Sequence, residues 1–363
     1  MAKELKDHNY YGIDSTIVAD SINEFGDRIT TFVVTHPRHI LAEMNTHRMF
    51  SRNSASSRAI PAKEMIRRVR EQPFIPIAWQ KEHSGMQGTE YITDEFCLQL
   101  IIDEWKDAAE NAVVRANRIS SGIVGKEGTE VTKQITNRLL EPFLHHTAII
   151  TATEYENFFK LRCPQYEDAY QQHHKSKKDY LKITDEPDMH PITDIGWLKQ
   201  NKGMGEIHIM ALAESMWDNY NESQPKLLKA GEYHIPFGDT FDEQLLKDYT
   251  WRKADEEVVD IDKLKREIAI ARCARISYGT FEGKEDYEAD IKLYDRLLSS
   301  QHLSPFEHVA KVMTKDEYYS HINGKIKLAN IENKPPFNVV KISNTGWCRN
   351  FKGFIQERAI LDV

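Results

Sequence analysis

Residues 46–61, THRMFSRNSASSRAIP, contain three arginines, four serines and a histidine. An arginine guanidinium can hold two phosphate oxygens at once, and serine hydroxyls and loop amides supply further donors. A run of this composition can equally be a solvated basic segment or a phosphorylation target. Here the run follows an amphipathic stretch and leads into Pro61, so both of its ends are anchored. This placement favours one wall of an anion-binding pocket.

Two further arginines stand in apolar surroundings. Arg138, in QITNRLLEPF, lies among leucines and an isoleucine, where a charged group needs a partner. That partner is either a carboxylate, of Glu141 or of another residue, or a bound anion, and the two interpretations carry equal weight. Arg162 closes NFFKLR after an aromatic pair. It is either an arginine at the edge of the core or part of a site that recognises a phosphate or a pyrimidine.

The segment HLSPFEH, residues 302–308, places two histidines on either side of a glutamate. Because Pro305 breaks helical spacing, the histidines need not share a face, and we expect no metal site here. We expect a bent turn that presents His302 to a ligand, while Glu307 and His308 make local hydrogen bonds.

Together these segments resemble the flavin-dependent thymidylate synthases, the ThyX family. The family signature is R-H-R followed by seven residues and a serine. Here it corresponds to Thr46-His47-Arg48, then MFSRNSA, then Ser56, with Arg58 two residues further on. The segments NRLLEPF, NFFKLR and HLSPFEH also match family segments, and ARCARISYG is similar to the family's ARVSY.

The order of these segments differs from that in the common family members. There, ARVSY and HxSPFEH precede R-H-R, whereas here they lie at 271–279 and 302–308. The chain therefore resembles a circularly permuted member. Such a change is mild when the termini lie close together, because packing does not depend on where the chain is cut.

The resemblance implies an α+β fold, ThyX-like, with a helical core flanked by antiparallel strands. It also implies a homotetramer with FAD-binding active sites between subunits. NADPH would reduce the flavin, and the methylene group of methylenetetrahydrofolate would pass to C5 of dUMP. Flavin hydride would then complete the methyl group of dTMP, so that no cysteine need act as a nucleophile.

The same resemblance assigns roles to individual residues. The positions that contact flavin are Thr46, His47, Arg48 and His302. The positions that bind dUMP are Glu43, Ser56, Arg58, Arg138 and Arg162. Within that set, Ser56 and Arg162 are the candidate catalytic residues. Arg58 and Arg138 are expected at the 5′-phosphate, and Arg162 is expected beside the pyrimidine.

Four positions depart from the family pattern. Thr46 replaces an arginine, Glu43 stands where a glutamine is usual, and Ser54 stands where a glutamate is usual. MGEIH, residues 204–208, replaces AQxEI. These changes alter charge and hydrogen bonding near the nucleotide. They leave open a sister hydroxymethylase, in which water finishes the transfer, and a non-catalytic nucleotide-binding homologue.

Composition narrows the remaining classes of function. With 48 Lys+Arg against 56 Asp+Glu, the net charge is −8, which argues against a general nucleic-acid binder. The four cysteines form no C-x-x-C pair, and the adjacent histidines at 145–146 and 173–174 rarely converge on one metal. We therefore expect no metal and a reducing, cytoplasmic setting. The N-terminal residues resemble no secretory signal, and no apolar run is long enough to span a membrane.

Periodicity and turn residues predict the elements that position these groups. Two strands flank a Gly26-Asp27 turn within residues 16–36. Helical patterns cover 38–50, 61–70 and 94–118, and a further helix ends at Pro142. In the long helix we expect Thr93 as the N-cap. Its predicted apolar side consists of Phe96, Leu100, Ile101, Trp105, Ala108 and Ala112.

Further along the chain, residues 147–163 predict a strand or buried turn that leads into a helix, and 205–220 predict another helix. Residues 164–203 are expected to form an insertion or mobile loop, and 221–262 a linker. After the linker we expect helices at 263–274 and 286–300, a short strand at 274–279 and a closing helix within 347–361. The parts 1–220 and 263–363 would form one intertwined catalytic domain.

Overall fold

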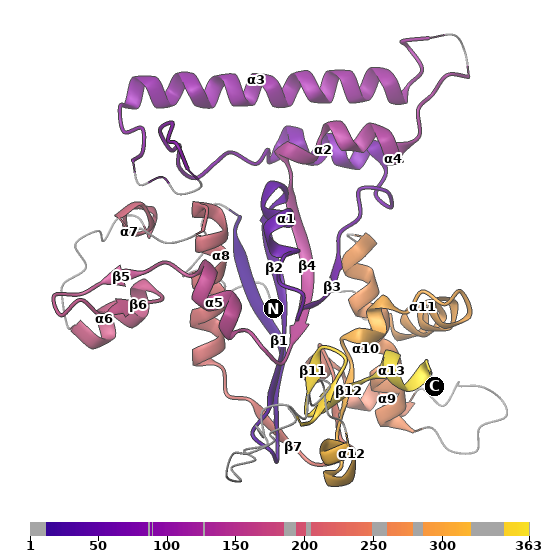
Figure 1. Cartoon of the computed structure of the whole chain (residues 1–363). Coiled ribbons are helices and arrows are strands. Elements are labelled where there is room, and N and C mark those ends of the chain that lie inside the picture. The colour runs from indigo at the N-terminus through magenta and orange to yellow at the C-terminus, as the bar shows by residue number, and fades with distance from the viewer. Residues whose placement is uncertain are drawn as a thin grey trace, which may run out of the picture.

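A five-stranded sheet forms the centre of the computed structural model (Figure 1), with the strand order β3-β4-β2-β1-β7. Neighbouring strands are antiparallel except β1 and β7, which are parallel. The strands are β1 (Asp14–Asn23), β2 (Arg28–Pro37), β3 (Ser51–Ser54), β4 (His145–Ala152) and β7 (Lys226–Leu228). The structure describes residues 12–85, 88, 90–125, 128–184, 194–200, 205–248, 260–278, 286–320 and 345–362.

The predicted hairpin at 16–36 is confirmed as β1 and β2. At the turn, Gly26 has φ +83°, a left-handed conformation that costs little only without a Cβ. The Asn23 side chain fixes this turn by accepting hydrogen bonds from the amides of Phe25 and Asp27. The strand predicted within 147–163 is also confirmed, because β4 pairs with β2 along its whole length.

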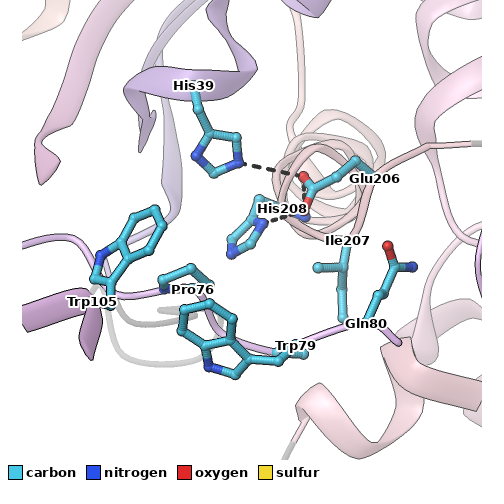
Figure 2. A pocket seen from close by; sticks show the side chains of 9 residues that line it. His39, Pro76, Trp79, Gln80, Trp105, Glu206, Ile207 and His208 are labelled. Carbon is cyan, nitrogen blue, oxygen red and sulfur yellow. Dashed lines mark hydrogen bonds and ion pairs between the residues drawn. The ribbon is translucent and has the colours of Figure 1, made fainter. Parts of the chain in front are cut away.

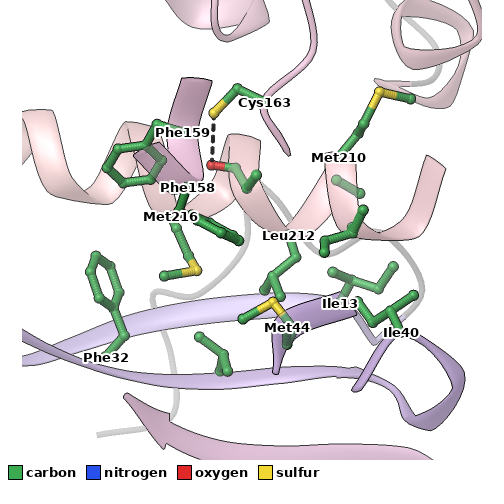
Figure 3. Close-up of a cluster of buried hydrophobic side chains, with 14 of the residues drawn as sticks. Ile13, Phe32, Ile40, Met44, Phe158, Phe159, Cys163, Met210, Leu212 and Met216 are labelled. Carbon is green, nitrogen blue, oxygen red and sulfur yellow. Dashed lines mark hydrogen bonds between the residues drawn. The ribbon is translucent and has the colours of Figure 1, made fainter. Parts of the chain in front are cut away.

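Both faces of this sheet are covered by helices. On one face, Phe32 and Val34 pack with α5 (Glu156–Arg162) and α8 (Ile207–Glu222), as Figure 3 shows for Phe32 and Met216. On the other face, Val33 and Ile149 pack with α10 (Ile261–Tyr278). The apolar runs of β2 and β4 therefore do not alternate with polar residues.

The α+β class is confirmed, but the centre differs from the expected helical core. A sheet occupies the middle, since β2 and β4 carry apolar side chains on both faces and need a helix layer on each. Among the described residues, no helix combines the length and apolarity that a membrane span requires.

A separate pair of helices lies beyond one end of the sheet (Figure 1). The two helices, α2 (Ala62–Glu71) and α3 (Glu95–Ser120), pack through Met65, Val69 and Val113. The predicted apolar side of α3 is right for Trp105 and Ala112, which pack against this cluster, but wrong for Phe96, which is 73% exposed, and Leu100, which is 52% exposed. The partner helix decides which side is buried, and α3 turns Ala109, Val113 and Ala116 toward α2.

Several predicted helix limits are corrected. The N-cap of α3 is Asp94 rather than Thr93, because the Asp94 carboxylate accepts from the Cys97 amide at 2.8 Å. The helix predicted at 38–50 is a 3₁₀ turn, η1 (Arg38–Ile40), and one turn of α1 (Leu41–Met44). The helix expected to end at Pro142 is broken into α4 (Lys133–Thr136), η2 (Asn137–Leu139) and η3 (Glu141–Phe143), with Pro142 inside η3.

The described part of 164–203 is folded, so the expectation of a mobile loop is wrong there. It contains β5 (Tyr166–Glu167), β6 (His173–His174), α6 (Lys177–Thr184) and α7 (Asp194–Gln200). Tyr166, Tyr180 and Trp197 form a small core of their own. Residues 185–193 and 201–203 of this prediction lie outside the described residues.

The predicted linker contributes β7 to the main sheet. It also holds β8 (Tyr233–His234), η4 (Gly238–Thr240) and α9 (Glu243–Asp248). In the C-terminal part, α11 (Tyr287–Ser299) confirms one predicted helix, and α10 continues to Tyr278 where a strand was expected. In this last part of the helix, Cys273, Ala274 and Ile276 are buried in the cluster that α10 forms with α11.

The predicted closing helix is mostly strand. The tail forms β10 (Trp347–Cys348), β11 (Phe351–Lys352), β12 (Phe354–Gln356) and the short α13 (Glu357–Leu361). Strand β12 pairs with β9 (Ala310–Val312), and β9 pairs with β8. The remaining elements are η5 (Ser304–Glu307) and α12 (Lys315–Ser320).

A line of buried hydrogen bonds joins this small sheet to the main one. His234 lies between Ser21, at 2.9 Å, and Thr31, at 2.8 Å. Thr31 bonds Thr151, and Thr151 bonds His308, each at 2.8 Å. Burial lowers the pKa of both histidines to about 3, so both are neutral. The hydrogen bonds of His308 are therefore long-range. The prediction that they would be local is wrong.

Candidate functional site

The basic residues predicted from the sequence, apart from His302, gather near one end of the main sheet, where β2 ends and β4 begins. Helix α1 follows β2 after the short turn η1, and the loop of residues 55–60 follows β3. The backbone of Arg38 is bound to that of Leu144 at this end, and Ala55 is bound to Thr147. The sheet therefore brings segments that are distant in sequence into two clusters of charged side chains.

The first is the Arg162 cluster, formed by Glu43, Thr46, His47, Arg52 and Arg162. Arg162 is the last residue of α5. Its Nε donates to His47 Nε2 at 3.2 Å, and one terminal nitrogen donates to Thr46 Oγ1 at 3.4 Å. The other terminal nitrogen lies 3.7 Å from the Glu43 carboxylate. The structure thus joins the NFFKLR arginine to the R-H-R-like segment.

His47 orients this arginine. Its ring is 6% exposed and packs between Phe50 and Phe158, with centroids 5.7 and 4.9 Å away. Burial, and then the charges of Arg162 and Arg52, lower the pKa of His47 to about 4. The imidazole is therefore neutral near pH 7, and its Nε2 can accept the hydrogen bond from Arg162.

Positive charge is in excess in the Arg162 cluster. Arg52 donates to the Met44 carbonyl at 2.7 Å, so it fixes the end of α1, and it forms no ion pair with a carboxylate of the described residues. Burial and the nearby charge of Glu206 raise the pKa of Glu43, while Arg162 lowers it. Glu43 is thus a weakly held partner of Arg162, and the carboxylate charge that acts on Arg52 is that of Glu307. Arg52 belongs to the basic run, but no role of its own was predicted for it.

The second is the Glu141 cluster, formed by Arg38, Ser57, Arg138, Glu141 and His146. One oxygen of Glu141 accepts from Ser57 at 2.7 Å, from Arg138 at 2.8 Å and from Arg38 at 3.3 Å. The predicted salt bridge between Arg138 and Glu141 is confirmed. The Arg138 side chain remains 50% exposed, so it can still meet a second anion.

The loop between β3 and α2 is held at several points. The Asn137 side chain donates to the carbonyls of Ser57 and Ile60, at 2.6 and 3.0 Å. The Ser56 amide donates to the Ser277 carbonyl at the end of α10, at 2.9 Å. The Ser56 hydroxyl accepts the Arg58 amide at 3.3 Å. The anchored loop predicted from the sequence is therefore present.

Arg48 and Arg58 differ from the arginines of the two clusters. Both are exposed, and neither guanidinium has a polar partner in the part of the chain that the structure describes. An unpaired guanidinium on an anchored segment is free to bind an anion.

Arg38 and His146 were not predicted as site residues. Arg38 lies 2.7 Å from His146 Nδ1 and also donates to the Ala55 carbonyl at 3.3 Å. Burial, followed by the charges of His36 and Arg38, lowers the pKa of His146 to about 2. These two residues can be recognised only by their position at facing ends of β2 and β4. Finding that position requires the register of the two strands.

His302 does not join either cluster. It is exposed and follows α11, and its neighbour Leu303 packs on the α10 side of the sheet. Ser304 is tied to Asn53 of β3 at 3.1 Å, and Glu307 is ion-paired with Arg358. Among the described residues, no polar contact links His302 to His47 or Arg162.

No family model matches the sequence, and no curated protein matches it. Solved structures that match include a UMP/dUMP methylase, PolB from Streptomyces cacaoi, bound with 5-Br UMP. It shares 14% identity, with 58% of this chain and 89% of that chain covered and a TM-score of 0.39. The same methylase bound with 5-Br dUMP gives 14% identity, 58% and 90% coverage and a TM-score of 0.38. Neither likeness is close enough to establish a shared fold.

Proposed function

We propose that this protein is a flavin-dependent enzyme that methylates dUMP at C5 to give dTMP. Methylenetetrahydrofolate donates the carbon, and NADPH supplies the reducing equivalents through FAD. A bond forms between the methylene carbon and C5 while the C5 proton is lost. A hydride then reduces the transferred group to methyl, and tetrahydrofolate leaves.

The observation that carries this proposal is the meeting of Arg162 with Thr46 and His47, which are more than a hundred residues away in sequence. The resemblance assigns these two segments to one active site. A neutral histidine holds the guanidinium in place, and the surplus charge of the Arg162 cluster suits the carbonyl edge of a pyrimidine.

The phosphate of dUMP would meet Arg58 and Arg138. Arg58 has no polar partner among the described residues, and half of the Arg138 side chain is exposed. The Glu141 carboxylate and the anchored loop hold both arginines near their places before a ligand arrives. This reduces the ordering cost of binding.

The residues present also fit a flavin. Arg48, Thr46 and His302 are exposed and offer donors to a pyrophosphate or to ring carbonyls, and bound FAD would supply the hydride. His47 is buried and bonded to Arg162, so it acts by orienting that arginine.

We propose a homotetramer, because the candidate residues of one chain do not converge. His302 lies on the side of the sheet that α10 covers, whereas His47 packs in the cluster beneath α8. Apolar side chains are also exposed around Arg138, where Ile135 is 61% and Leu139 is 41% exposed. A second copy placed there would bury these side chains and complete the site.

A hydroxymethylated product is the second candidate. Glu43 replaces the usual glutamine, lies 3.7 Å from Arg162 and has a raised pKa. A carboxyl group of this kind can exchange a proton with water. Water would then complete the transfer in place of hydride.

The test is the mass of the nucleotide formed from dUMP, FAD, NADPH and methylenetetrahydrofolate. We expect a product heavier than dUMP by one methylene unit, and no such product when NADPH is omitted. An additional oxygen would identify the hydroxymethylase. Unchanged dUMP beside a flavin that is bound and reduced would contradict the proposal, and Glu43→Gln with Thr46→Arg would show whether these departures are responsible.

A further inference from the structure

A cavity of about 250 Å³ lies between η1, the N-terminus of α8 and the chain segment that leads to α3 (Figure 2). None of its residues is a candidate catalytic or binding residue predicted from the sequence, although Glu206, Ile207 and His208 belong to the MGEIH segment that departs from the family pattern. Figure 2 shows His39, Glu206 and His208 on one side, with Trp79, Pro76 and Trp105 facing them. The remaining wall residues are Ala78, Gln80 and Ile207.

Glu206 is held in one orientation at the edge of this cavity. Its Oε2 accepts from the His208 amide at 2.9 Å, and its Oε1 is bonded to His208 Nδ1. His39 Nε2 lies 3.8 Å from the same Oε2. Burial acts to raise the pKa of Glu206, but the bonds from His208 and His39 outweigh it and bring the pKa to about 2. The cavity therefore presents a fixed carboxylate.

The walls select for a flat ligand that carries N–H groups. Among the described residues no lysine or arginine lines the cavity, so anionic groups gain nothing there. Trp105 donates its Nε1–H to the Phe74 carbonyl at 2.8 Å, which fixes its indole, and Trp79 packs edge-on against it at 5.6 Å. Rigid aromatic walls bind ring faces well.

Metal coordination fits this arrangement poorly, although the three polar side chains lie close together. His208 Nε2 accepts the Ile77 amide at 3.0 Å, so the ring proton resides on Nδ1 and is donated to Glu206. A neutral imidazole in this tautomer has no lone pair left for a metal.

We propose that this cavity binds an amino-substituted nitrogen heterocycle, whose N–H edge meets Glu206 and whose ring packs against Trp79. A carboxylate opposite an N–H edge makes strong, charge-assisted hydrogen bonds. The volume is below the roughly 300–1,000 Å³ of drug-sized sites, so it accommodates a single ring system rather than a whole cofactor.

The cavity lies near the Arg162 cluster. Its Glu206 and the cluster's Arg162 both act on the pKa of Glu43 through their charges. The choice of ligands to test rests on the proposed function. Its folate donor carries a pterin ring, which bears an amino group, and its FAD and NADPH carry adenine. Both rings present the same chemistry, and the experiment separates them.

The experiment titrates folic acid, adenosine and uridine separately into the full-length protein by calorimetry. Glu206→Gln keeps the shape of the side chain and removes its charge, and Trp79→Ala removes one wall. For both variants we expect binding of the preferred heterocycle to weaken roughly ten- to hundredfold. Trp79→Phe should retain most of the affinity. Glu110→Gln, an exposed glutamate of α3 paired with Arg70, is the matched control.

Preference for folic acid over adenosine would assign the cavity to the donor, and the reverse preference would assign it to adenine. If Glu206→Gln and Trp79→Ala bind both heterocycles as the wild type does, the inference is wrong. The inference is also wrong if Zn²⁺ binds to the protein, if this binding depends on His39, and if bound Zn²⁺ does not prevent either heterocycle from binding. Glu206 caps α8, so Trp79→Ala provides the test if Glu206→Gln fails to fold. Because the titration needs no turnover, a protein that makes no dTMP can still bind the heterocycle.

Discussion

In the Glu141 cluster one carboxylate accepts from three donors, whereas in the Arg162 cluster Glu43 lies 3.7 Å from Arg162 and the carboxylate charge that acts on Arg52 is that of Glu307. Each cluster also contains a neutral histidine that lies within hydrogen-bonding distance of an arginine. The first arrangement bonds both of its arginines to one carboxylate and stabilises the fold, and only the half-exposed Arg138 remains open to a ligand. The second leaves positive charge available to a ligand. The bonds that each guanidinium already makes, rather than the number of arginines, decide how much of it remains open to a ligand.

The largest effect should come from removing the carboxylate at the centre of the Glu141 cluster. Glu141→Ala leaves the guanidinium of Arg38, whose side chain is only 18% exposed, without its counter-charge. We expect the free energy of unfolding to fall by about 2–3 kcal/mol, measured by urea denaturation.

Glu43→Ala is the matched control in the other cluster. Its carboxylate is 37% exposed and 3.7 Å from Arg162, so its loss should cost less than about 1 kcal/mol. Equal destabilisation by the two variants would remove the distinction between the clusters.

The next largest effect should be on the affinity for the ligand, with no change in the stability of the fold. Arg58→Ala removes an exposed guanidinium that has no polar partner among the described residues. We expect dUMP binding to weaken by roughly 1.5–3 kcal/mol, with the unfolding curve unchanged. Arg70→Ala, which removes an exposed arginine of α2, should leave both quantities unchanged. Unaltered dUMP affinity in Arg58→Ala would exclude that residue from the phosphate site.

A smaller effect should appear in the pH dependence of stability. The pKa of His146 is about 2 and that of His47 about 4, both below the ordinary value of 6.5. Below pH 6.5 these histidines bind protons in the unfolded chain, whereas in the folded chain they stay neutral down to their lower pKa values. The stability that these neutral histidines contribute is therefore complete above pH 6.5 and is lost as the pH falls toward each folded pKa.

The histidine variants separate the two clusters in this respect. His146→Gln should flatten the slope of unfolding free energy against pH by at most about 1.4 kcal/mol per pH unit between pH 6 and 4. His47→Gln should flatten it over a narrower range, because His47 begins to bind protons near pH 4 in the folded state. An unchanged slope in both variants would show that neither ring is kept neutral.

Local sequence pattern was sufficient for much of the fold. The Gly26-Asp27 turn defined the hairpin, and the apolar runs of β2 and β4 marked them as strands. Pro61 marked the start of α2. These features depend on residues next to one another in the chain. The tail strand β12 could not be found in this way, since it is three residues long and depends on β9 for its hydrogen bonds.

The same division applies to the candidate site. The sequence identified Arg162, His47 and the contact between Arg138 and Glu141, because each belongs to a recognisable segment. No role was predicted for Arg38 or His39, and Glu206 was noted only as part of MGEIH. Their partners come from other elements, so only the strand register and the placement of α8 bring them together. The periodicity of α3 misplaced Phe96 and Leu100 for the same reason.

The central claim is that the Arg162 cluster binds the nucleotide. Calorimetric titration of dUMP into the wild type, Arg162→Lys and Arg162→Ala tests it most directly. We predict that Arg162→Ala weakens dUMP binding by roughly tenfold or more, and that Arg162→Lys recovers only part of the loss, because lysine cannot present two parallel donors. Wild-type affinity in Arg162→Ala, with the fold intact, would contradict the account.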